Sequence, residues 1–224
     1  MFTLLFWVML AFAVTDWIAS WRGWHSLRWL TKPVTLVLLI AWFTQVSGWR
    51  GSLVWFGVGL VFSLLGDVLL QAPPRFFLPG VGAFFLAHLA YIIGFLQNVQ
   101  QPDARMLIPV LIVGGAFWLL NRRIRQGLRQ NGETELLVPV MAYALVLSLM
   151  WLAALSTLFR SGWTEPPAAL VSLGAGLFFL SDSVLAYNRF VRALPASDLL
   201  VMVTYHLGQI LIVGGALGQY AGLL

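Results

Sequence analysis

Long apolar runs separated by short polar breaks recur along the whole sequence, and they constrain the fold more than any other feature. We expect eight membrane-spanning helices, at Phe2–Ser20, Pro33–Ser47, Ser52–Leu70, Phe77–Gln97, Met106–Asn121, Glu135–Phe159, Pro167–Tyr187 and Ala196–Tyr220. Most runs are close to the roughly 20 residues that cross a hydrocarbon core, although the second is short. The breaks are rich in Pro, Gly and Arg and too short for a soluble domain. The sequence therefore predicts an all-α, polytopic integral membrane protein, with residues 1–224 forming a single transmembrane helical domain.

The composition agrees with a chain surrounded by lipid. Of the 224 residues, 60% are hydrophobic and 9% are charged, whereas about 25% of residues are charged in a typical soluble domain. The chain has no Cys, which excludes thiol and disulfide chemistry. The first residues include neither a basic segment nor a small-residue cleavage site. We therefore expect a retained first helix and no signal peptide.

The basic residues predict how the helices are oriented. Ten of the thirteen Lys and Arg residues fall in the alternate breaks that follow the first, third, fifth and seventh runs: Arg22, Arg28, Lys32, Arg75, Arg122, Arg123, Arg125, Arg129, Arg189 and Arg192. The positive-inside rule places these breaks in the cytoplasm and both termini outside, in the inner membrane of a cell. The formal charge of +5 is explained in this way, and we expect no nucleic-acid partner.

A short internal similarity suggests a parallel repeat of two four-helix halves. The segment "FSLLGDVLLQAPPRF" (Phe62–Phe76) resembles "FFLSDSVLAYNRF" (Phe178–Phe190). The two segments end the third and seventh runs, which are four spans apart and so cross in the same direction. Asp67 and Asp182 are therefore expected at similar depth, near the cytoplasmic ends of their helices.

Ionisable side chains inside a membrane span are costly, and they usually face the bundle interior and mark function. Four such residues stand in these runs: Asp67, His88, Asp182 and His206. The polar residues beside them are Ser63, Tyr91, Ser181, Tyr205 and Gln209. Spacings of three or four residues place several of them on shared helix faces. Since consecutive spans are usually neighbours, we expect one pocket with two carboxylates and two imidazoles, open toward the cytoplasm.

Each of these residues also has a purely structural interpretation. Asp67 and Asp182 could lie near the headgroups, paired with Arg75 or Arg189. The histidines and tyrosines could be interhelical hydrogen-bonding residues. We interpret Asp16 and Asp198 as helix-end or interfacial acids and assign no chemistry to the loop acids, which are Asp103, Glu133, Glu135 and Glu165.

Acid–base hydrolysis is the most natural use of two buried carboxyl groups, because one can hold a proton while the other does not. The His spacings typical of zinc sites are absent, and we predict neither a metal nor a cofactor. The G-x-G-D signature of intramembrane aspartyl proteases is not met, because Asp67 follows "LLG". No G-x-S-x-G nucleophile motif is present either.

The ordered set of these segments resembles the YhhN family of membrane proteins, which includes the lysoplasmalogenases. The matching segments are "TKP" (Thr31–Pro33), "GDVLL" (Gly66–Leu70), "GAFFLAHLAYIIGF" (Gly82–Phe95), "FFLSDSVLA" (Phe178–Ala186) and "TYHLGQILI" (Thr204–Ile212). The resemblance covers essentially the whole chain and implies a hydrolase that cleaves the vinyl ether bond of lysoplasmalogens. The products would be a fatty aldehyde and a glycerophospho-base.

This chemistry suggests a role for each candidate residue. Vinyl ether hydrolysis needs a general acid, a base that guides water and an anion that stabilises the intermediate cation. We expect Asp67 and Asp182 to divide these tasks, with His88 and His206 orienting them or relaying protons. The expected substrate-binding residues are Lys32, Tyr91, Ser181, Asn188, Tyr205 and Gln209. Lys32 or Arg189 would meet the phosphate, and Phe84, Phe85, Phe178 and Phe179 would surround the single chain.

Two other classes of function stay open at this point. A transporter of lysolipids or small solutes could also have parallel repeats and polar groups within its spans. A lipid-binding or scaffold protein is disfavoured, because so many intramembrane polar groups are costly without a use. The expected partners are a lysophospholipid substrate and membrane lipids, with no obligate protein partner evident.

Overall fold

The computed structural model of the chain describes residues 3–97 and 103–222, and eight long helices account for most of them. They are α1 (Leu4–Arg22), α2 (His25–Ser47), α3 (Leu53–Gln71), α4 (Phe77–Phe95), α5 (Leu107–Gln130), α6 (Leu137–Ser156), α7 (Glu165–Phe190) and α8 (Ser197–Ala221). Eight helices of the described part are long and apolar enough to cross a membrane. This confirms the prediction of a polytopic helical protein. The predicted start of the first span at Phe2 lies outside the described residues.

Helix α2 begins at His25, eight residues before the predicted boundary at Pro33. Gly23 ends α1 with a left-handed φ of 69°, so only Gly23 and Trp24 separate the two helices. Pro33 is accommodated inside α2, as is common in membrane helices, where neighbouring groups satisfy the freed backbone. Arg28 and Lys32 are consequently helical residues and not the loop residues that we expected.

Helix α5 also exceeds its predicted span, continuing beyond Asn121 to Gln130. Its last turns are amphipathic: Ile124 and Leu128 are buried in a small cluster with Phe190, while Arg125 and Arg129 are exposed. Apolar residues at this spacing form one helix face, so packing against α7 keeps the basic segment helical.

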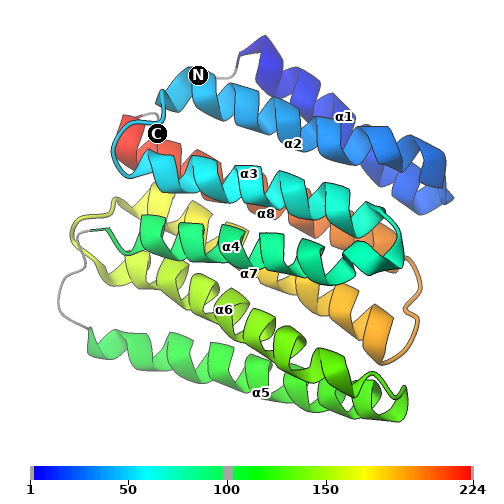
Figure 1. Cartoon of the computed structure of the whole chain (residues 1–224). Helices are drawn as coiled ribbons and strands as arrows, with labels where there is room; N and C mark the ends of the chain where they lie inside the picture. Colours follow the sequence, from blue (N-terminus) through cyan, green and yellow to red (C-terminus); the bar gives the residue numbers. More distant parts are fainter. Residues whose placement is uncertain (1–2, 98–102, 223–224) are drawn as a thin grey trace.

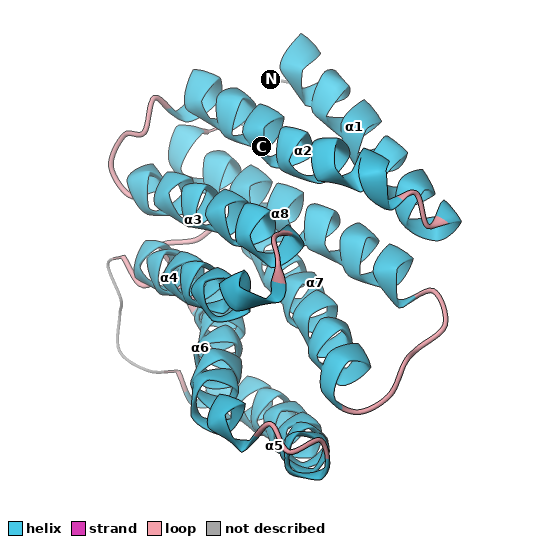
Figure 2. Cartoon of the chain, turned by 45° about the vertical axis from the view of Figure 1, so that its right-hand side comes forward, coloured by secondary structure: helices cyan, strands magenta, loops and turns pink. Residues whose placement is uncertain are grey.

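The helices run back and forth, and all the connections that follow odd-numbered helices meet at one end of the bundle (Figure 1). We call this the basic end, because the ten basic residues named above belong to it. Helices α3 and α7 run in the same direction (Figure 1). Asp67 and Asp182 fall in the second halves of these helices, which end at the basic end. Helix α8 is the most buried span and α5 the least, with α5 at the edge of the bundle (Figure 2). An origin of the two halves by duplication stays a prediction.

Helices α7 and α8 pack most closely because glycines allow their backbones to touch. A Cβ atom at Gly174 would lie 2.8 Å from the Gly208 carbonyl oxygen, and a Cβ at Gly208 would lie 2.9 Å from the Gly174 carbonyl oxygen. Small residues commonly allow such close helix approach in membranes. This contact holds Asp182 of α7 and Tyr205 of α8 on adjoining backbones.

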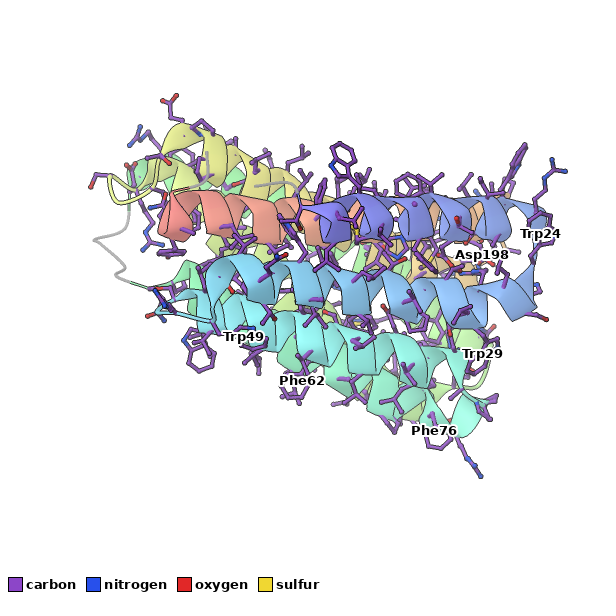
Figure 3. The ribbon with its side chains drawn as sticks, turned by 90° about the horizontal axis from the view of Figure 1, so that it is seen from above. Trp24, Trp29, Trp49, Phe62, Phe76 and Asp198 are labelled. Atoms are coloured by element: carbon purple, nitrogen blue, oxygen red, sulfur yellow. The ribbon has the colours of Figure 1, made fainter. Side chains whose placement is uncertain are left out.

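The outer surface of the bundle is apolar and carries tryptophans toward its ends. Trp24 and Trp29 project at the basic end and Trp49 at the opposite end, with Phe62 between them (Figure 3). Trp24 and Trp29 are each 53% exposed. Tryptophan is enriched at both membrane–water interfaces, so this arrangement matches a bundle that spans a bilayer.

Candidate active site

Asp67 and Asp182 line the same cavity, which has a volume of about 70 Å³ and lies toward the basic end. We call it the central cavity. Its polar lining residues are Lys32, Asp67, Tyr143, Ser181, Asp182, Arg189 and Tyr205. The rest of the lining is apolar and includes Phe77, Phe84 and Met202. The structure thus brings the two candidate carboxylates together around one apolar space, although they come from different halves of the chain.

Asp67 is 1% exposed and has two partners from other helices. The Lys32 Nζ of α2 lies 2.9 Å from Asp67 Oδ1, and the Tyr205 hydroxyl of α8 donates a hydrogen bond of 2.7 Å to Asp67 Oδ2. The structural interpretation in which Arg75 pairs with Asp67 is therefore wrong. Lys32 is itself only 8% exposed, and it lies inside the bundle with its charge directed at Asp67.

Asp182 has a different environment. The Tyr143 hydroxyl of α6 donates a hydrogen bond to Asp182 Oδ2, and His88 Nε2 of α4 lies 3.0 Å from that hydroxyl and 3.7 Å from the carboxylate oxygen. His88 is fully buried. Asp182 is thus held by a Tyr–His pair, and among the described residues it has no Lys or Arg partner. Pairing of Asp182 with Arg189, the structural interpretation, is wrong.

Tyr143 is a candidate site residue that the sequence analysis missed, because it lines the central cavity and bonds Asp182. It is the one tyrosine in the sixth run, and it stands four residues before Leu147, which is buried. A tyrosine on the buried face of a span needs a partner for its hydroxyl, which is the signal that could have found it.

His206 lies apart from this arrangement. The Trp17 indole of α1 donates a hydrogen bond of 3.1 Å to His206 Nδ1, and the other ring nitrogen has no hydrogen-bond partner among the described groups. His206 does not line the central cavity. The structure places His206 at the α1–α8 contact and not in the lining of the central cavity.

The six predicted substrate-binding residues separate into two groups. Lys32, Ser181 and Tyr205 line the central cavity. The other three make structural contacts elsewhere: Tyr91 donates a 2.6 Å hydrogen bond to Gln209 Oε1 in the core, and Asn188 accepts one of 2.9 Å from the Leu194 backbone. The structure does not bring these three, Tyr91, Gln209 and Asn188, to the lining of the central cavity. The four phenylalanines differ too, because only Phe84 lines the cavity.

A second cavity of about 270 Å³ adjoins the central cavity at the basic end. We call it the vestibule. It shares five lining residues with the central cavity: Lys32, Leu70, Leu185, Val201 and Met202. Its own polar residues are His25, Arg28, Gln71 and Asp198. The vestibule extends the central cavity with a more polar space.

The two acids that we expected at helix ends differ from each other. Asp198 lies in the first turn of α8 and forms a 2.7 Å ion pair with Arg28, as an interfacial acid would. Asp16 is fully buried and accepts a 2.6 Å hydrogen bond from the Thr31 hydroxyl. The interfacial interpretation of Asp16 is therefore wrong, because the short α1–α2 turn folds α2 over this side chain. Within the described ranges, no three His, Asp or Glu side chains gather as metal ligands would.

The similarity to known proteins extends over nearly the whole bundle. A sequence model of the YhhN family matches residues 27–216. Lysoplasmalogenase TMEM86B of Homo sapiens is 34% identical over 200 residues, which cover 88% of this chain and 80% of that protein. The membrane protein YhhN of Escherichia coli strain CFT073 is 32% identical over 215 residues, which cover 93% and 98% of the two chains.

A third relative, a lysoplasmalogenase of Mycobacterium bovis, is 30% identical over 172 residues, covering 72% of this chain and 59% of that protein. No solved structure is similar enough to count as a match. The family model, the human relative and the Escherichia coli relative each match most of the chain. The chain therefore belongs to the YhhN family of membrane proteins.

Proposed function

We propose that this protein is a membrane hydrolase that cleaves the vinyl ether bond of lysoplasmalogens to a fatty aldehyde and a glycerophospho-base. The observation that carries the proposal is that Asp67 and Asp182 line one apolar cavity. Relatives named lysoplasmalogenase support this activity and favour hydrolysis over transport. No metal or cofactor is invoked.

The reaction needs an acid that protonates the vinyl carbon and an anion that stabilises the oxocarbenium ion formed by this protonation. Protonation of the vinyl carbon that is remote from the ether oxygen forms a C–H bond and leaves an oxocarbenium ion. Water adds to the oxygen-bearing carbon, and the hemiacetal collapses to aldehyde and alcohol. A positioned carboxylic acid and a nearby carboxylate supply these two needs.

The two environments suggest which carboxyl group does which task. The Lys32 ammonium lies 2.9 Å from Asp67 Oδ1, and a charge-assisted contact of this kind can hold a carboxylate in place. Asp67 is therefore the anion that stabilises the oxocarbenium ion. Asp182 has a Tyr–His pair beside it and is the general acid. Tyr143 and His88 are positioning residues, because they hold the Asp182 carboxyl group at the cavity wall.

The shape of the cavity suits a lipid with one chain. The alkenyl chain would lie along the apolar lining near Phe77 and Phe84. Arg189 is exposed, lines the cavity and stacks its guanidinium 3.7 Å from the centre of the Phe77 ring. Since Lys32 is paired with Asp67, Arg189 is the better candidate for the substrate phosphate. The vestibule would receive the rest of the polar headgroup.

The orientation in the membrane is also a proposal. The excess of basic residues supports a cytoplasmic location of the basic end, so that substrate would enter from the cytoplasmic leaflet of the inner membrane. Helices α1 and α8 would then begin and end, respectively, on the outer side. Labelling of single cysteines placed at Arg192 and Arg105 with an impermeant reagent in intact cells would test this, with only the Arg105 position expected to react.

Product analysis on purified protein tests the activity. Detergent-solubilised protein is incubated with alkenyl and acyl lysophosphatidylethanolamine, each with and without chelator. The proposal expects aldehyde from the alkenyl substrate and no fatty acid from the acyl substrate, unaffected by chelator. Fatty acid from the acyl substrate would indicate a lysophospholipase and contradict the vinyl ether mechanism.

A further inference from the structure

A small cavity lies behind Asp182, on the side away from the predicted position of the lipid. Its volume is about 30 Å³, and it lies among α5, α6 and α7. Four residues line both this cavity and the central cavity: Val140, Tyr143, Asp182 and Ala186. The Asp182 carboxyl group therefore forms part of the wall between the two spaces.

Two side chains that line the small cavity have buried polar atoms with no partner. Asn121 of α5 is 3% exposed, and neither its amide nitrogen nor its amide oxygen has a hydrogen-bond partner among the described residues. The same is true of the Ser183 Oγ of α7. Buried polar groups in native proteins are nearly always hydrogen-bonded to protein or to ordered water. Three such atoms around one cavity therefore indicate water as the ligand.

The cavity has the size that water needs, and three of its lining residues have polar groups that can bind water. A buried water requires roughly 10–15 Å³ and two to four polar partners, so this cavity can hold one or two. Asn121 offers a donor and an acceptor, Ser183 offers a hydroxyl, and Asp182 Oδ1 has no hydrogen-bond partner among the described residues. A water here would bridge α5 and α7 and touch the Asp182 carboxyl group.

Asn121 also connects this cavity to the surface. It lines an outer groove of about 470 Å³ on α5, together with Arg122, Arg125 and Arg129. These arginines are exposed and belong to the basic end, where the helix reaches the aqueous interface. Phe117 and Asn121 line both the groove and the small cavity. Phe117 and Asn121 therefore form the boundary between the small cavity and the groove, away from the space that the lipid chain would fill.

We propose that the cavity behind Asp182 holds the hydrolytic water, which enters from the α5 groove past Asn121. This rests on the proposed function. After Asp182 has given its proton to the vinyl carbon, its carboxylate faces this water. The water passes the Asp182 carboxylate into the central cavity, where its oxygen bonds to the oxygen-bearing carbon of the cation, and Asp182 takes the released proton and regains its acid form. Collapse of the hemiacetal then breaks the bond from that carbon to the glyceryl oxygen, which gains a proton as the hemiacetal hydroxyl loses one.

Hydroxyl-radical footprinting of the wild-type protein tests the water itself, independently of any activity. Radicals formed from bound water label neighbouring side chains that bulk solvent does not reach. We expect labelling of Phe179, which lines the small cavity and is 9% exposed. The adjacent Phe178 is fully buried and does not line it, so it serves as the internal control. Absence of labelling at Phe179 would overturn the proposal.

Asn121→Leu tests the role of the water in hydrolysis, because leucine has a similar volume and binds no water. We expect kcat to fall about tenfold, as for loss of one hydrogen bond to a reacting group, with KM unchanged. In D₂O, the vinyl carbon receives a deuteron. A cation that water does not capture can lose a proton and return to substrate, so recovered substrate should carry deuterium at the vinyl carbon with the variant and not with wild type. A merely structural role of Asn121 would not produce this exchange.

Ser172→Ala is the matched control, because Ser172 is also a buried serine of α7 but bonds the Ala154 carbonyl oxygen far from the cavity lining. We expect Ser172→Ala to keep wild-type kcat and Ser183→Ala to lower it. Wild-type kcat in Asn121→Leu, with no exchange, would overturn the hydrolytic role. If wild-type protein releases no aldehyde at all, the proposed function fails, and footprinting still decides whether the cavity holds water.

Discussion

Lys32 Nζ lies 2.9 Å from Asp67 Oδ1, and both side chains are withdrawn from the membrane surface. Breaking a buried ion pair from one side leaves an uncompensated charge, which costs about 3–5 kcal/mol. We predict that Lys32→Met lowers both turnover and the melting temperature in detergent, whereas Lys32→Arg keeps the charge and loses less. The double variant with Asp67→Asn should regain the melting temperature without regaining turnover. A Lys32→Met protein that melts and turns over like wild type would contradict the functional ion pair.

Tyr143 and Tyr91 provide a matched pair of interior tyrosines, Tyr143 half-buried and Tyr91 fully buried. Tyr143 donates to Asp182, and Tyr91 donates to Gln209. Tyr143→Phe should lower kcat at least about tenfold, because the carboxyl group loses the donor that orients it. Tyr91→Phe should leave kcat near wild type and lower the free energy of unfolding by about 1–3 kcal/mol, because it leaves the Gln209 oxygen unpaired. Steady-state kinetics and thermal melts on both variants check this, and the opposite pattern would indicate that Tyr91 serves the reaction.

Arg189 should determine affinity for the phosphate and not the rate of the chemical step. Arg189→Gln removes one charged hydrogen-bonding group, so we predict that KM rises about tenfold with kcat unchanged. Arg192→Gln is the control, because Arg192 lies at the same end but does not line the central cavity. An alkenyl glycerol without phosphate should show no effect of either change. Equal KM values for wild type and Arg189→Gln with the phosphate-containing substrate would refute the assignment.

The contact between α7 and α8 predicts a large difference between two glycines. Gly208→Ala places a Cβ atom 2.9 Å from the Gly174 carbonyl oxygen, so the two helices must separate. Gly114→Ala meets no atom within 4 Å. Overpacking typically costs about 1–3 kcal/mol, so Gly208→Ala should lower the melting temperature while Gly114→Ala does not. Identical melting curves would show that the helices are further apart than described.

The sequence alone was sufficient for the eight spans and for the common depth of Asp67 and Asp182. Both conclusions depend on strong effects: the length of apolar segments that lipid requires and the direction of each successive span. The cost of a carboxylate in lipid also singled out the two acids. Helix ends were less accurate, because packing against α7 extends α5 and a two-residue turn lengthens α2.

The partners of the two acids could not be predicted in the same way. A tyrosine costs little in a span, so Tyr143 carried no strong signal until α6 was seen beside α4 and α7. Tyr91 and Gln209 were recognised as interior polar residues, but spacing does not tell whether a helix face meets a cavity or another helix. Asp16 stands near the end of its apolar run and resembled an interfacial acid, and only the register between α1 and α2 buries it against Thr31.

The central claim is that Asp67 and Asp182, facing one cavity, carry out the hydrolysis together. The most direct test is the rate of aldehyde release from an alkenyl lysophospholipid by Asp67→Asn and by Asp182→Asn, with Asp103→Asn as control. Asp103 is a loop acid at the opposite end of the bundle, and its side chain is bonded to Arg105. We predict that each active-site variant loses at least about a hundredfold in kcat while remaining folded, and that the control keeps its rate. Near wild-type turnover by either active-site variant would contradict the two-carboxylate mechanism.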